Sequence, residues 1–298
     1  MDKLHEPWQC RWYVRCGLLA ALVACRVPAV APLHSADATP TLQVWLSHAP
    51  SQHDSLRYEV SLLDIPIAWV AIETASATAS EIASAIASAP TNANVSMNAT
   101  TATTSTDAAT VIRATMQLAG ATRALFDATV NDNSLLSNSG QLLQSTVVVV
   151  GTLSSHCYTS IDPENLHGTT TRQDFDDSGD TRESVWLTRP PLTISTWLLA
   201  LQHWPIDKDL TTESLLVMPD CQFARVVATQ RQRAMIATAF GNRRAVRLEV
   251  QTSLTGFTDE SRDRPVAVSI WLSDDADQWP LLITAATPLG QARAEMLP

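Results

Sequence analysis

The C-terminal segment places apolar side chains at every second position, which is the pattern of a β-strand. In Val266–Ser273, the residues Val, Val, Ile and Leu alternate with Ala, Ser, Trp and Ser, and successive strand side chains point to opposite faces. Asp274–Asp277 then supplies a polar turn. Trp279–Thr284 resumes an apolar run in which Pro280 suits a strand start, where no ladder N–H is needed. After a further bend at Gly290 the chain ends, so we expect it to close with an antiparallel hairpin.

Similar patterns recur through the chain and predict a mainly β fold. Leu56–Leu62 and Val246–Gln251 alternate, and Val147–Val150 predicts a central strand because both of its faces are apolar. Thr193–His203 has helical spacing, a Ser or Thr cap and a stop at Pro205. We therefore expect a curved antiparallel sheet, forming a half-barrel or barrel of about ten strands, with one or two packing helices.

Other local expectations rest on shorter patterns. Leu118–Val130 is expected to be a short helix or a strand, Asn131–Asn133 a polar turn, and Asp177–Asp180 the turn of a hairpin. Ala224–Thr229 and Met235–Thr238 are expected to be two separate strands.

Composition divides the chain into a targeting segment, residues 1–38, and a single β-rich domain, residues 39–298. Within that domain, residues 74–110 consist almost entirely of Ala, Ser, Thr and Asn. Little of this stretch can be buried, and its hydroxyl side chains compete with the backbone for hydrogen bonds. We interpret it as a low-complexity insertion within a hairpin.

The N-terminus has the features of an export signal. Lys3, Arg11 and Arg15 form a positive region before the short apolar run Cys16–Cys25. Two processing routes remain open: cleavage after Ala36-Asp37-Ala38, or lipidation of Cys25 at the end of a lipobox-like Leu-Val-Ala-Cys. A third interpretation makes Cys25 an ordinary small residue of the apolar run. The first two place the mature protein in the periplasm or on the periplasmic face of the outer membrane.

Two cysteines, Cys157 and Cys221, lie outside the targeting segment. An even pair in an oxidising compartment predicts one disulfide. The alternative is two separate buried thiols.

The overall charge excludes some partners. The formal net charge is −10, and an acidic chain without a basic stripe repels phosphate backbones, so nucleic-acid binding is disfavoured. No apolar stretch reaches the ~20 residues needed for a mature transmembrane helix.

The sequence contains no standard catalytic or cofactor motif, and we expect no enzymatic activity, no cofactor and no metal site. It lacks the nucleophile-elbow, zinc-protease, phosphate-loop and dinucleotide-binding patterns. Asp174–Gly179 resembles the first half of a calcium loop, but Val185 stands where the bidentate Glu belongs. The three carboxylates of Asp274–Asp277 are interpreted as a turn.

Several tryptophans are the strongest candidates for a binding site. If the sheet is an open half-barrel, an apolar groove is expected to be lined by Trp69, Trp186, Trp197 and Trp271. The alternative is that these side chains belong to the core.

The C-terminal segment resembles the signature of an exported bacterial family, domain of unknown function 3108. The positions that carry the resemblance are Trp271, Ser273, Asp274, Asp275, Pro280, Leu289, Gly290 and Glu295. Leu56–Leu62, Ile65-Pro66, Phe175-Asp176 and Pro190–Pro205 are similar to it more weakly. The resemblance implies a fold and an exported location, and no mechanism.

Together these features favour a non-enzymatic envelope protein that binds an apolar or lipid ligand, or an envelope protein partner. The alternative is a structural or assembly component of the envelope without a ligand. A cavity large enough for an acyl chain would favour the ligand carrier, and a filled interior would favour the structural component.

Overall fold

The computed structural model describes residues 55–76, 110–120, 122–123, 128–137, 139–151, 154–162, 164–174, 180–206, 210–254, 268–287 and 289–298. Cys25, both processing sites and most of the low-complexity insertion lie outside the described residues. Within them, no helix is both long enough and apolar enough to span a bilayer.

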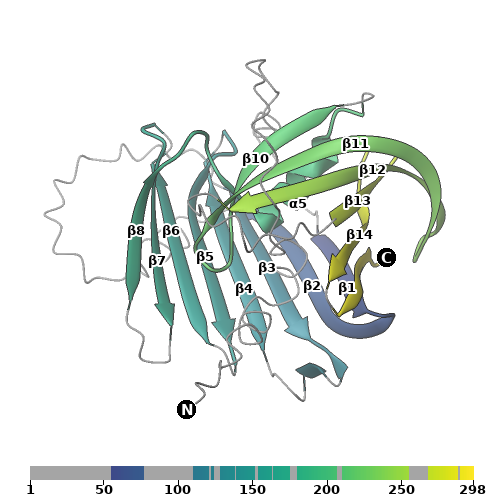
Figure 1. The fold of residues 1–298 in the computed structure, drawn as a ribbon, viewed down its shortest axis with the longest axis horizontal. Coiled ribbons are helices and arrows are strands. Elements are labelled where there is room, and N and C mark those ends of the chain that lie inside the picture. Colours follow the sequence, from purple (N-terminus) through teal and green to yellow (C-terminus); the bar gives the residue numbers. More distant parts are fainter. Residues whose placement is uncertain are drawn as a thin grey trace, which may run out of the picture.

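One 15-stranded sheet runs through the molecule in the order β8-β7-β6-β5-β4-β3-β2-β1-β15-β14-β13-β12-β11-β10-β9 (Figure 1). Every neighbouring pair is antiparallel except β9 and β10, which are parallel. The strands are β1 (Ser55–Leu62), β2 (Ile65–Ser76), β3 (Thr110–Leu118), β4 (Thr129–Leu136), β5 (Leu142–Val150), β6 (Ser155–Asp162), β7 (His167–Asp174), β8 (Thr181–Trp186), β9 (Leu192–Thr193), β10 (Thr211–Val217), β11 (Phe223–Thr238), β12 (Gly241–Leu254), β13 (Val268–Ser273), β14 (Pro280–Thr287) and β15 (Gly290–Met296).

The mainly β prediction is confirmed, but the predicted count of about ten strands is wrong. The missed strands carry few apolar residues. β4 reads TVNDNSLL and β6 reads SHCYTSID, so neither shows a run of alternating apolar residues. Neighbouring strands satisfy their backbone groups nonetheless, because pairing depends on N–H and C=O groups more than on side chains.

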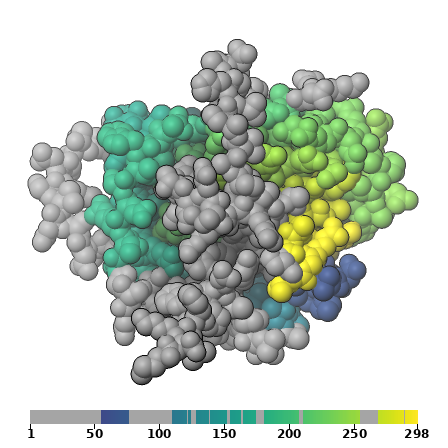
Figure 2. All heavy atoms as spheres, in the orientation of Figure 1, coloured from purple at the N-terminus to yellow at the C-terminus, as the bar shows by residue number. Residues whose placement is uncertain are grey.

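The sheet is not closed by hydrogen bonds, and its two ends overlap instead. Cys157 on β6 and Cys221 in the β10–β11 turn form a disulfide across 64 residues of sequence. A Cβ atom on Gly168 of β7 would lie 3.1 Å from Cζ of Phe223, at the start of β11. The edge that contains β9 and β10 therefore lies against the inner face of β4–β7. In the space-filling view, the teal strands β5–β8 and the green to yellow strands β11–β15 lie toward opposite sides of the molecule (Figure 2).

A short helix fills the inside of this curved sheet. α5 (Ile194–Ala200) continues into a 3-10 turn, η2 (Leu201–His203), and every residue of α5 is buried. Thr193 caps α5, since its side chain accepts from the backbone N–H of Thr196, and the predicted cap and helix are confirmed. Trp197 and Trp204 are 2% and 0% exposed, so the interior is occupied by large side chains from this segment.

Two local predictions are corrected. Asn131–Asn133 is not a turn but the middle of β4, paired with β3 and β5. The two strands expected within 224–238 are one strand, β11, with a register shift between Gln230 and Gln232. That bulge breaks the alternation, which is why the pattern suggested two elements.

The C-terminal hairpin is confirmed by the pairing of β13 with β14. The segment after Gly290 adds a further strand, β15, which pairs with β14 and with β1. Gly290 has φ +124, and a Cβ there would overlap the Leu63 side chain, so glycine is required at this bend.

Candidate functional site

The four tryptophans proposed to line a groove are not brought together. Trp197 lies inside, on α5. Trp69 on β2 and Trp271 on β13 are on the outer face, linked across the sheet by the pairs Trp69–Glu59, Glu59–Glu295, Glu295–Leu282 and Leu282–Trp271. Four strand spacings separate them, roughly 19 Å. Trp186 is 75% exposed on β8 and packs edge-on against His167.

Among the residues that the structure describes, a small cavity lies at the place where an apolar ligand was expected. A space of about 30 Å³ lies between α5 and the inner face of β10–β14, next to Trp197, Val250, Ile270 and Ile283. It has room for roughly one or two water molecules and is far too small for an acyl chain. α5 occupies the volume that such a ligand would need.

A cluster of hydroxyls surrounds Asp132 on the inner side of β4. Ser195 donates to Oδ2 of Asp132 at 2.6 Å, and Ser134 donates to Oδ1 at 3.1 Å. The Thr193 hydroxyl lies 2.9 Å from that of Ser134 and 3.0 Å from that of Ser195. Burial raises the pKa of Asp132 to about 6, while the hydroxyl hydrogen bonds lower it. Because the partners come from β4, β9 and α5, the cluster fastens the helix to the sheet.

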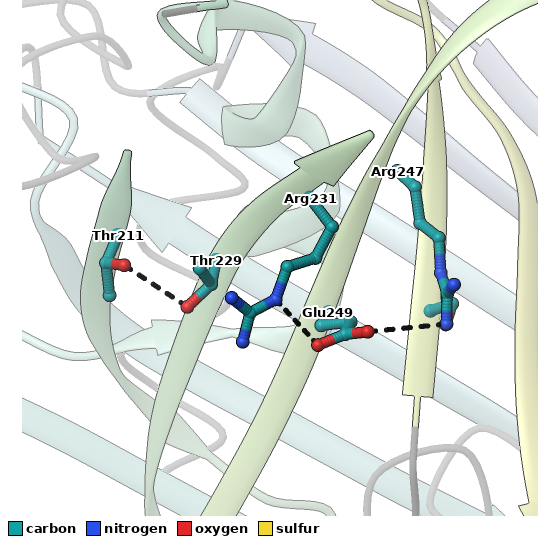
Figure 3. A network of polar contacts seen from close by, with 6 residues as sticks. Thr211, Thr229, Arg231, Arg247 and Glu249 are labelled. Carbon is teal, nitrogen blue, oxygen red and sulfur yellow. Dashed lines mark hydrogen bonds and ion pairs between the residues drawn. The ribbon is translucent and has the colours of Figure 1, made fainter. Parts of the chain in front are cut away.

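The outer side of β10–β13 carries a different polar network (Figure 3). Nε of Arg231 donates to Oε2 of Glu249 at 2.7 Å, and Nη2 of Arg247 lies 3.6 Å from Oε1 of the same carboxylate. Arg247 also donates to the Ser269 hydroxyl at 3.0 and 3.2 Å and lies over the Trp271 ring at 5.9 Å. One carboxylate is therefore shared by two guanidinium groups.

A second pair of arginines, one on β11 and one between β8 and β9, repeats this arrangement around Glu213 on β10. Nη2 of Arg225 lies 2.6 Å from Oε2 of Glu213, and Nη2 of Arg189 lies 2.9 Å from Oε1. The hydrogen bond from Arg225 and the charges of both arginines hold the pKa of Glu213 below its usual value. We call the six side chains of the two networks, Arg189, Arg225, Arg231, Arg247, Glu213 and Glu249, the arginine face.

The arginine face has surplus positive charge and free donors. Four guanidinium groups share two carboxylates, which leaves two uncompensated positive charges. Arg225 and Arg231 retain 46% and 49% side-chain exposure. A guanidinium has five N–H donors in a planar fork that matches carboxylate and phosphate groups. The arrangement is therefore chemically suited to an anionic partner.

The acidic turn between β13 and β14 has a structural role. Oδ1 of Asp275 accepts from Ser273 Oγ and from the backbone N–H groups of Asp277 and Gln278. Asp274 is paired with Arg233 and Arg244. Across the described parts of the chain, no group of three or more His, Cys, Asp or Glu side chains is arranged to hold a metal ion.

Sequence inspection missed both polar clusters. The arginine face had a visible signal, because residues 223–248 contain six arginines and no acidic residue in a chain of net charge −10. The Asp132 cluster had none, since its partners lie about sixty residues away along the chain.

Comparisons with known proteins supply no family. No protein-family model matches the sequence, and no curated protein does. One similar solved structure is a crystal structure of a β-barrel-like protein of domain of unknown function 1849 from Brucella abortus, with 7% identity, a TM-score of 0.45, and coverage of 82% of this chain and 94% of that one. A likeness at this level carries no argument about function. Membership of domain of unknown function 3108 stays a prediction.

Proposed function

We propose that this protein is an exported, non-enzymatic binding module that holds an anionic envelope partner on its arginine face. The observation that carries the proposal is the pair of networks in which two arginines share one carboxylate on the outer side of β10–β13. Figure 3 shows the network around Glu249. The export signal and the lack of catalytic motifs support the periplasmic location and the absence of catalysis.

The filled interior supports an outer site over an inner one. α5 and η2 occupy the concave side, and the cavity beside Trp197 is about 30 Å³. An apolar ligand has no room on the concave side of the sheet beside α5. The partner contacts the surface, and its anionic groups accept from the free guanidinium N–H donors.

The same filled interior favours a second candidate function, a structural component of the envelope without a ligand. In that case the arginine–carboxylate pairs serve only to satisfy one another on a solvated sheet. Exposed ion pairs of this kind contribute about 0–1 kcal/mol to stability. The two candidates differ in whether removal of an arginine weakens binding to the envelope.

The proposal predicts that Arg225→Gln/Arg231→Gln lowers the affinity for Gram-negative envelope vesicles by about 10-fold or more, since two exposed charges are lost. Glu213 keeps Arg189 and Glu249 keeps Arg247, so each carboxylate retains a partner and the fold is preserved. Co-sedimentation at low and high salt measures the effect, and salt is expected to weaken wild-type binding. The matched control is Arg182→Gln, an exposed arginine on β8, which should bind like wild type.

Equal binding by the double variant and wild type would overturn the arginine face as the site. No retention of wild type at low salt, with folding verified by circular dichroism, would favour the structural alternative.

A further inference from the structure

The outer halves of β11 and β12 project beyond their neighbours in the sheet. β10 pairs with β11 only as far as Thr229, and β13 pairs with β12 only from Ala245. Residues 235–238 pair with 241–244, and residues 230 and 232–234 pair with 245–248, so the segment 230–244 forms the outer part of a two-stranded ribbon that curves away from the rest of the sheet at one end of the molecule (Figure 1). We call the segment 230–244 the ribbon.

The ribbon combines arginines with an exposed apolar side chain. Met235 is 63% exposed and stands directly opposite Arg244 in the register. Arg233 lies two positions before Met235, so its side chain projects on the same side of the strand. Arg243 is exposed and makes no ion pair with any described residue. Arg243 projects to the opposite face from Arg244, so Met235 shares its face with Arg233 and Arg244, and Arg243 lies on the other face of the ribbon.

The local charge is positive although the chain as a whole is acidic. The ribbon contains Arg231, Arg233, Arg243 and Arg244 and no acidic residue. Asp274, from the β13–β14 turn, lies 2.7 Å from Arg244 and 3.8 Å from Arg233, and Glu249 on β12 lies 2.7 Å from Arg231. These two carboxylates offset two of the four charges. The protein has a net charge of −10, so an anionic surface repels most of it and attracts the ribbon. The protein is therefore expected to approach such a surface with the ribbon first.

We infer that the ribbon docks on a bilayer surface containing anionic phospholipid, with guanidinium groups on the lipid phosphates and Met235 inserted between the headgroups. A planar fork of N–H donors suits phosphate oxygens. A flexible thioether side chain loses little by leaving water for the interfacial region. An acidic protein would satisfy the arginines but gives no reason for an exposed methionine among them. The inference deepens the proposed function by naming a lipid surface as a partner, and, apart from Arg231, it uses residues outside the arginine face.

The test is co-sedimentation of the full chain with vesicles of phosphatidylglycerol and phosphatidylcholine, and with vesicles of phosphatidylcholine alone. Every protein carries Cys25→Ser, so that no lipid anchor contributes. Wild type should bind the phosphatidylglycerol vesicles, bind phosphatidylcholine at least 10-fold more weakly, and lose affinity as salt is raised. Arg243→Gln/Arg244→Gln should lower the partition coefficient about 30-fold. Each arginine near an anionic membrane raises that coefficient by a factor of about 5 to 6, and the two factors multiply. Asp274 keeps Arg233 as its partner in that variant.

Two further variants sharpen the result. Met235→Ser leaves the charge unchanged and should weaken binding several-fold, including at high salt. Arg182→Gln removes a charge from β8, a strand that does not neighbour β11 or β12 in the sheet, and should have no effect on binding. Equal binding to both vesicle types, an unchanged Arg243→Gln/Arg244→Gln variant, or an equal loss in the Arg182→Gln control would each overturn the inference.

The outcomes for the ribbon and the arginine face are separable. One outcome is that phosphatidylglycerol vesicles retain no protein, while envelope vesicles bind wild type and not Arg225→Gln/Arg231→Gln. In that case the lipid inference is wrong and the proposed function stands. Loss of envelope binding after the vesicles are treated with protease would identify a protein partner and would also count against the lipid surface.

Discussion

Removing the disulfide is expected to lower the free energy of unfolding by about 4 kcal/mol. Cys157 and Cys221 are separated by 64 residues, and closing a loop of this length removes about that much conformational entropy from the unfolded chain. The bond also joins β6 to the β10–β11 turn, where no ladder of hydrogen bonds closes the sheet. For a domain of this size the loss corresponds to roughly 10 °C in melting temperature.

The measurement is urea unfolding of the oxidised protein with and without reductant. The matched control is Cys157→Ala/Cys221→Ala, which should have the lower stability from the start and show no response to reductant. This variant keeps the N-terminal cysteines, so it tests whether reductant acts through them. Thiol titration verifies that reduction is complete. If the fully reduced protein unfolds at the same urea concentration as the oxidised protein, the disulfide does not hold the two ends of the sheet together.

The sequence was sufficient to predict the elements whose pattern is local. The alternation in Val268–Ser273, the polar turn and Pro280 predicted the β13–β14 hairpin, and the Thr193 cap with its helical spacing predicted α5. These features depend on a few neighbouring residues and on the geometry of one element. They needed no knowledge of what packs against them.

Elements that depend on distant partners could not be predicted. Asn131-Asp132-Asn133 has the composition of a turn, but β3 and β5 pair with its backbone, and hydroxyls from β9 and α5 satisfy the carboxylate of Asp132. Trp69 and Trp271 were correctly placed on strands by their patterns, yet which face each one occupies depends on register. An apolar groove was expected because the sequence gives no sign that α5 fills the inside.

The arginine face lies between these cases. Its excess of arginine was readable in residues 223–248, but its carboxylate partners follow from strand pairing. Glu213 is opposite Val227 on β11, and Glu249 is opposite Thr229 and Ser269. These pairings bring carboxylates from β10 and β12 beside arginines of β11 and β12. A composition signal thus indicated a surface, and only register identified which charges remain uncompensated.

Asp132→Asn is expected to abolish a pH-dependent contribution of up to about 3 kcal/mol to stability. Burial raises the pKa of Asp132 to about 6 from a usual value of 3.8, so the folded state takes up a proton at a higher pH than the unfolded chain. The contribution of this residue therefore increases as pH falls through about 6 and is complete below about 4. It is absent at pH 7, and each unit of pKa difference corresponds to about 1.4 kcal/mol.

Asparagine resembles the protonated acid in shape and cannot titrate, so the variant should be at least as stable as wild type at pH 7. Its amide still offers an oxygen to Ser134 and Ser195 and adds donors toward the hydroxyls. Urea unfolding of both proteins between pH 4 and 7.5 gives the difference directly, because other titrating groups contribute equally to each. Asp277→Asn, an exposed carboxyl in the β13–β14 turn, controls for the loss of one negative charge.

The sign of the difference decides the role of the cluster. If Asp132→Asn destabilises the protein equally at every pH, the hydrogen-bond geometry of the carboxylate matters and its protonation does not. If the variant is weaker than wild type at pH 7 and matches it at pH 4, the ionised form stabilises the contact between α5 and β4. Asp132 is buried among hydroxyls and has no cationic partner among the described residues, which favours the opposite order: the stability of wild type increases relative to that of the variant as the solution becomes acidic.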